Sequence, residues 1–256
     1  MKDVDATAAP LMEHLVELRR RLIWSFVALA GAFGVSFYFA DKILAFLAQP
    51  LIRAFPPGEG KLVYTKLYEA FFVEVRVAFF AAFFLAFPVI ANQIWAFVAP
   101  GLYAKEKRAF LPFLIATPVL FISGGALAYY FVMPKAFEFF LGYQGNLGGI
   151  QQEALPAIGD YLSLVMHFIL AFGISFLLPV LLMLLERAGL VTRQQLSGGR
   201  RYAVLIAFVI AAVATPPDVL SQFMLAVPLI LLYELSLIAI WFTERRRARE
   251  PTRSEA

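Results

Sequence analysis

Two acidic residues, Glu17 and Glu106, are the side chains in this sequence best suited to bind a cationic ligand. Each lies beside a long apolar run, among basic residues. A carboxylate can bind a guanidinium group through two parallel hydrogen bonds, so two carboxylates on one rim suit a ligand with two arginine side chains. Each also has an ordinary structural explanation. Glu17 has Arg20 and Arg21 within about one helical turn, and Glu106 can complement the positive end of the next helix.

The sequence lacks the residue patterns that most enzymes and metal sites need. It has no cysteine and only two histidines, which excludes disulfides, thiolate metal sites and a histidine-rich metal site. Neither His-Glu-x-x-His, Gly-x-Ser-x-Gly nor a phosphate-binding loop occurs. We therefore predict a protein that is not an enzyme and has no cofactor or bound metal.

The composition is that of an integral membrane protein. Hydrophobic residues make up 61% of the chain and charged residues 16%, with a mean hydropathy of +0.77. A typical soluble domain carries about 25% charged residues. The net charge of +4 does not indicate a nucleic-acid partner, because the basic residues cluster at the ends of apolar runs.

Six apolar runs predict a single all-α domain, residues 1–256, with six transmembrane helices. Roughly 20 helical residues cross a hydrocarbon core of about 30 Å. The expected spans are residues 22–39, 71–97, 110–133, 161–185, 202–214 and 219–242. Before the first span, Leu11, Leu15 and Leu18 share one helical face and predict an amphipathic interfacial helix over 11–21.

The connections are expected to be less regular than the spans. Prolines and glycines predict that 40–70 is irregular, with short helical pieces at most, and that 134–160 is a loop. A kink is expected in the fourth span near Pro179. The fifth span is short for a hydrocarbon core, so we expect the bilayer to thin around it.

The distribution of basic residues predicts that both termini lie in the cytoplasm. With six spans, sixteen of the 22 Lys and Arg residues fall on the side of the termini, five fall on the other side, and Arg76 lies in the second span. Loops rich in Lys and Arg stay on the cytoplasmic side. Residues 243–256 would then form a basic cytoplasmic tail.

Three polar residues in or next to the spans each have a functional and a structural interpretation. Glu234, midway along the sixth span, is a proton or substrate site, or else a carboxylate paired inside the helix bundle. Gln93 lies on a transport path or forms a hydrogen bond between helices. Asp218 is functional, or it caps the sixth helix.

Three segments, taken together and in this order, resemble the TatC family, whose members are the signal-reading subunits of the twin-arginine translocase. They are residues 14–19 (His-Leu-Val-Glu-Leu-Arg), residues 93–103 (Gln-Ile-Trp-Ala-Phe-Val-Ala-Pro-Gly-Leu-Tyr) followed by Glu106, and residues 215–218 (Thr-Pro-Pro-Asp). The similarity covers nearly the whole chain, and the combination is specific although each motif alone is weak.

The resemblance implies a receptor in the bacterial cytoplasmic (inner) membrane. Such a receptor binds twin-arginine signal peptides at its cytoplasmic face and associates with itself in a receptor complex. With the single-span partners TatA and TatB it exports folded proteins, using the proton-motive force. The positions that match the family's signal-peptide site are Glu17, Glu106, Arg19, Phe97 and Lys105. Other functional or characteristic positions of the family are matched by Pro50, Gln93, Tyr129, Asp218 and Glu234.

The fourth span departs from the family pattern. Many members carry a polar residue, often Glu, where this chain has the apolar Leu177. We expect a partner helix to lie along the fourth span and on the outer half of the fifth, near Val213, where alanines permit close packing.

A different function, a secondary transporter of a small solute, would place Glu234 and Gln93 on its path. Two similar inverted halves would support it. No such repeat is apparent, because spans one to three and four to six differ in length and in the placement of proline.

Overall fold

A computed structural model describes residues 4–56, 61–102, 111–215 and 218–249. The chain divides into two compact units: residues 1–49, 62–118 and 157–162 form unit 1, and residues 50–61, 119–156 and 163–256 form unit 2. The elements are α1 (Val4–Tyr38), α2 (Ala40–Ala54), α3 (Glu69–Leu102), α4 (Leu111–Leu127), the π-helix η2 (Ala128–Val132), α5 (Met133–Leu141), β1 (Gly145–Leu147), β2 (Ile150–Gln152), α6 (Ile158–Ser175), α7 (Leu178–Arg187), α8 (Arg193–Gly198), α9 (Arg200–Ala214) and α10 (Val219–Arg249).

The predicted membrane architecture is confirmed. Within the described residues, five helical stretches are long and apolar enough to cross a bilayer: His14–Tyr38, Glu69–Phe97, Phe113–Leu141, Ile158–Arg187 and Val219–Arg245. Helix α9 corresponds to the remaining expected span, the fifth along the chain, and has 15 residues, or about 22 Å at 1.5 Å per residue. It is therefore short of a core of about 30 Å, as expected, while thinning of the bilayer around it stays a prediction.

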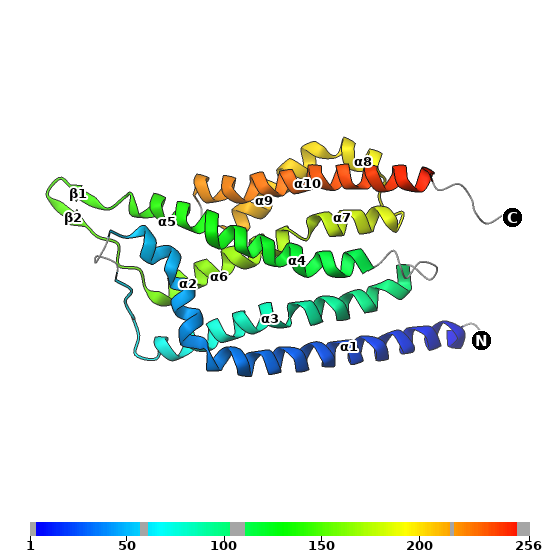
Figure 1. Cartoon of the computed structure of the whole chain (residues 1–256), viewed down its shortest axis with the longest axis horizontal. Coiled ribbons are helices and arrows are strands. Elements are labelled where there is room, and N and C mark those ends of the chain that lie inside the picture. Colours follow the sequence, from blue (N-terminus) through cyan, green and yellow to red (C-terminus); the bar gives the residue numbers. More distant parts are fainter. Residues whose placement is uncertain (1–3, 57–60, 103–110, 216–217, 250–256) are drawn as a thin grey trace. The chain divides into compact units, whose positions relative to one another are not determined.

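Unit 1 is built on the antiparallel pair α1 and α3, which lie side by side in Figure 1. Buried alanines recur every four residues on α3, at Ala78, Ala82 and Ala86. Small residues on one helical face let helices approach closely in a membrane, where the hydrophobic effect does not drive them together. Large side chains such as Trp24 and Phe26 of α1 are exposed, as lipid-facing residues are.

Unit 2 contains a close approach of α4 and α6 that requires glycine. A Cβ atom on Gly124 would lie 2.5 Å from the backbone oxygen of Phe172, and one on Gly173 would lie 2.8 Å from the Phe121 ring. Phe121 and Phe172 are fully buried. In the same unit, α10 packs against α7 and α9, and the Tyr233 hydroxyl donates a 2.6 Å hydrogen bond to the Leu196 carbonyl.

The structure differs from the sequence-based expectations at the N-terminal side of the chain. The predicted interfacial helix and first span are one continuous 35-residue helix, α1, with no break between them. The segment expected to be irregular contains the 15-residue helix α2, which runs through Pro50. The buried residues Leu47, Leu51 and Phe55 recur every four residues, and this apolar face outweighs the cost of one helix-breaking proline.

A second difference lies between the third and fourth spans. The helix continues past Pro134 to Leu141, because Pro134 sits in the first turn of α5, where a missing N–H costs little. A small antiparallel hairpin, β1 and β2, then departs from the all-α expectation. Its turn residues, Gly148 and Gly149, both have positive φ, at 61° and 99°, which a tight hairpin turn needs.

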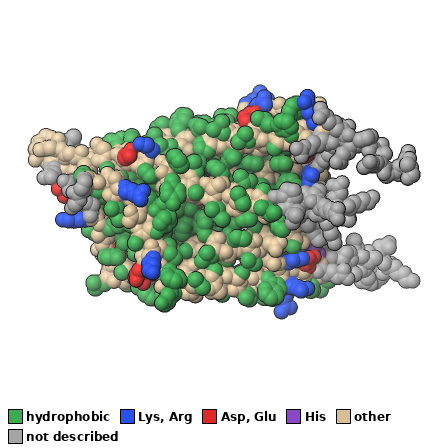
Figure 2. All heavy atoms as spheres, viewed as in Figure 1, with side chains coloured by type: hydrophobic (Ala, Val, Ile, Leu, Met, Phe, Trp, Pro, Cys, Tyr) green, Lys and Arg blue, Asp and Glu red, His purple; other side chains and the backbone are tan. Residues whose placement is uncertain are grey.

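Two further boundaries concern the fourth and sixth spans. The fourth span is interrupted between Ser175 and Leu178, close to the expected kink at Pro179. Helix α10 extends to Arg249, into the predicted tail. Figure 2 shows hydrophobic side chains over the middle of the helices and the charged side chains gathered near helix ends, as a bilayer-embedded surface requires.

Candidate functional site: a polar rim on α1 and α3

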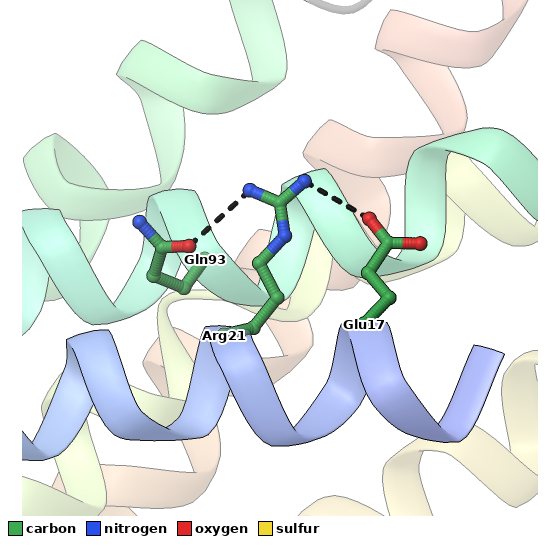
Figure 3. A network of polar contacts seen from close by, with 3 residues as sticks. All are labelled: Glu17, Arg21 and Gln93. Carbon is green, nitrogen blue, oxygen red and sulfur yellow. Dashed lines mark hydrogen bonds and ion pairs between the residues drawn. The ribbon is translucent and has the colours of Figure 1, made fainter. Parts of the chain in front are cut away.

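Glu17, Arg21 and Gln93 form a polar network between α1 and α3 (Figure 3). Arg21 Nη2 lies 3.0 Å from Glu17 Oε1, within about one turn of α1. Arg21 Nη1 donates a 3.3 Å hydrogen bond across the helix pair to Gln93 Oε1. One guanidinium thus contacts a carboxylate on its own helix and an amide on the neighbouring one.

This network borders an open hollow of about 580 Å³. Its lining residues are Val16, Glu17, Arg20, Arg21, Trp24 and Gln93. The side chains of Glu17 and Arg21 are about one third exposed, at 34% and 32%. A water-accessible carboxylate with cations around it can bind a guanidinium or an ammonium group.

A stacked aromatic pair lies beside the network. The rings of His14 on α1 and Phe97 on α3 have centroids 4.3 Å apart and planes inclined by 20°. His14 precedes Glu17 by three residues, so the two project from nearby positions on α1. A ligand at this rim would therefore meet a charged group, the Glu17 carboxylate, next to an apolar one, the His14–Phe97 pair.

Of the predicted signal-peptide residues, the structure brings Glu17 and Phe97 to this rim. Arg19 lies on α1 and is exposed. Lys105 and Glu106 lie outside the described residues. The pairing of Glu17 and Glu106 on one rim therefore stays a prediction from the sequence.

The polar residues with two interpretations all have structural partners. Gln93 makes the interhelical hydrogen bond described above. In unit 2, Glu234 Oε1 lies 2.8 Å from Arg200 Nε, and the Glu234 side chain is 39% exposed, so this carboxylate is paired but not enclosed within the bundle. Asp218 Oδ1 accepts a 2.7 Å hydrogen bond from the Ser221 backbone N–H, which is a cap at the start of α10.

The other predicted positions lie apart from the rim network. Pro50 is buried within α2, and Tyr129 is buried in the π-helix η2. Leu177 immediately precedes α7. Val213, near the end of α9, is 85% exposed and thus available to a partner helix.

Two residues of the rim, Arg21 and His14, carry no functional prediction from the sequence. The four-residue spacing marks Arg21 only as a local partner of Glu17. His14 stands out only as part of the segment 14–19. Its contact with Phe97 joins residues far apart in the chain, and no local pattern reports such a pair.

Comparisons with known proteins agree on one family. The model of the Sec-independent protein translocase protein (TatC) family matches residues 13–228. A TatC protein of Magnetococcus marinus is 50% identical, covering 97% of this chain and 90% of the relative. One from Rickettsia prowazekii is 42% identical, covering 92% and 94%. A crystal structure described as the twin arginine translocase receptor TatC has a TM-score of 0.77 and 38% identity, covering 88% of this chain and 98% of that one.

Proposed function

This chain belongs to the TatC family of Sec-independent protein translocase proteins, and we propose that its α1–α3 rim binds twin-arginine signal peptides. The protein is a receptor subunit of the twin-arginine translocase. The observation that supports this placement is the partly exposed Glu17 carboxylate, already bonded to a guanidinium, at the edge of an open hollow.

In this proposal the two arginines of the signal peptide pair with Glu17 and Glu106. The Oε1 atom of Glu17 is bonded to Arg21, whereas no hydrogen bond within the described residues reaches Oε2. The His14–Phe97 pair offers an apolar surface for the hydrophobic part of the peptide. Arg19 and Lys105 are cations near the two carboxylates in the sequence.

Photocrosslinking tests the proposal. A photoreactive group next to the paired arginines of a signal peptide is expected to crosslink to this chain near His14, Glu17 or Phe97. The matched peptide with two lysines should not crosslink, because lysine cannot form the two parallel bonds. Equal crosslinking of both peptides would contradict the proposal.

The partners are proposed to be single-span TatA and TatB subunits, and export is proposed to use the proton-motive force. Val213→Cys is expected to form a disulfide with a cysteine in the membrane span of such a partner, because Val213 is exposed on α9 beside small alanines. The exposed position Leu155→Cys, in the connection before α6, is the matched control and should not crosslink. Failure at Val213 and its neighbours would contradict this placement.

The protein is proposed to lie in the bacterial inner membrane with both termini cytoplasmic. The absence of cysteine makes single-cysteine labelling clean. Asn146→Cys, on the exposed hairpin strand β1, is expected to react with a membrane-impermeant reagent from outside the cell only. Labelling from the cytoplasm would contradict the topology.

The transporter alternative is not favoured. Membership of a translocase family speaks against it. The intramembrane carboxylate that would carry a coupling proton, Glu234, already has Arg200 as its partner. The side-chain oxygen of Gln93 likewise accepts a hydrogen bond from Arg21.

A further inference from the structure

We propose that Arg21 acts as an internal competitor for the signal peptide, occupying Glu17 in the empty receptor and setting the threshold that a peptide must exceed. This inference rests on the proposed role of Glu17. It adds a residue, Arg21, that sets the apparent affinity of the site, and a step, the exchange of one guanidinium for another on the same carboxylate.

The contact between Arg21 and Glu17 uses only one nitrogen of the guanidinium and one oxygen of the carboxylate, so another guanidinium can replace it. One nitrogen of Arg21, Nη2, meets one oxygen of Glu17, Oε1, at 3.0 Å. The other arm of the guanidinium, Nη1, points to Gln93 at 3.3 Å (Figure 3). Arg21 therefore divides its fork between two acceptors, whereas a peptide arginine approaching from the hollow can use both oxygens of the carboxylate.

Release of Arg21 leaves it with a partner. Gln93 lies on α3 and lines the same hollow as Glu17. When a peptide arginine takes Glu17, Arg21 keeps its hydrogen bond to the Gln93 carbonyl oxygen, so the displaced cation is not left unpaired beside the membrane. Both side chains of the ion pair are about one third exposed, so the exchange needs no unfolding of α1.

Competition of this kind lowers the apparent affinity of every cationic peptide by the same factor, because a peptide binds only those receptors in which Arg21 does not hold Glu17. The preference for arginine over lysine comes from the peptide's own contact, since arginine can form a bidentate pair with the carboxylate and lysine offers a point charge. Arg21 therefore sets how strong that contact must be for binding, and it leaves the ratio of the two affinities unchanged.

The test uses the purified full-length chain and two fluorescent signal peptides, one with paired arginines and one with paired lysines. Arg21→Gln is expected to tighten binding of the arginine peptide about threefold or more, because the binding-competent carboxylate is no longer occupied. It should tighten the lysine peptide by the same factor, so that the ratio of the two affinities stays unchanged. Arg21→Lys should tighten both peptides less, since lysine still holds Glu17 with a point charge.

Arg20→Gln is the matched control. Arg20 lines the same hollow and carries the same charge, but among the described residues the ion pair of Glu17 is with Arg21 and not with Arg20. Its removal should strengthen both peptides only through the lower local positive charge, and by a smaller factor than Arg21→Gln. Affinities in Arg21→Gln that are no tighter than in Arg20→Gln overturn the inference.

The outcomes separate this inference from the proposed function. If Glu17→Ala binds the arginine peptide like the wild type, the binding site itself is misplaced. If Glu17→Ala loses binding and Arg21→Gln binds neither peptide more tightly than Arg20→Gln, only the competition is wrong. Gln93→Leu provides a further check, because loss of the second acceptor should weaken the arginine peptide while Glu17 remains intact.

Discussion

Alanine at Glu17 or at Glu106 is expected to abolish or greatly weaken signal-peptide binding while the protein still inserts and folds. An exposed ion pair is worth only about 0–1 kcal/mol. A bidentate contact in a partly water-excluded groove contributes more, about 1.5–3 kcal/mol per charged hydrogen bond. Because Glu17 is one third exposed, we expect the lower part of that range for its contact. Loss of either carboxylate would still reduce affinity about tenfold or more.

Binding of a fluorescent twin-arginine peptide to each purified variant measures this effect. Glutamine at either position should retain part of the binding, since one acceptor oxygen remains, and affinity should fall as salt rises. Glu138→Ala is the control, because Glu138 is an exposed carboxylate paired with Lys135 on α5. Wild-type affinity in both alanine variants would leave two ordinary helix-end carboxylates and a signal site elsewhere.

Gly124→Leu is expected to prevent stable packing of α4 against α6. Its Cβ would lie 2.5 Å from a backbone oxygen and 2.8 Å from the Phe176 ring, closer than real atoms approach. A backbone oxygen in a helix cannot rotate away as a side chain does. Overpacking typically costs about 1–3 kcal/mol, and we expect the upper end here because Phe172 is fully buried.

Thermal unfolding in detergent, with the yield of folded protein, measures the change. Gly34→Leu is the matched control, because a Cβ at Gly34 on α1 meets nothing within 4 Å. We expect the control to unfold at a temperature close to that of the wild type. Equal stability of the two variants would show that α4 and α6 separate easily, and that the close approach is not needed for the fold.

The sequence by itself determined the spans, because a helix in lipid must satisfy its backbone internally and present apolar side chains outward. The apolar runs that form α3, α9 and α10 can therefore be identified from the sequence without any knowledge of how the helices pack. It also determined the kink before Pro179 and the candidate carboxylates, since motif and charge are local features. Helix α2 is not predicted from the sequence. On local pattern alone, the prolines in and after it count more against a helix than its apolar face counts for one.

Only the tertiary structure decided what the polar groups contact. From the sequence, Glu17 could pair with either Arg20 or Arg21. The position of Gln93 on α3 selects Arg21, because that guanidinium can reach both acceptors at once. In the same way, Glu234 meets Arg200 across two helices. Hydrogen-bond partners distant in sequence depend on how helices are placed side by side, and the 3.6-residue period of a single helix carries no information about its neighbour.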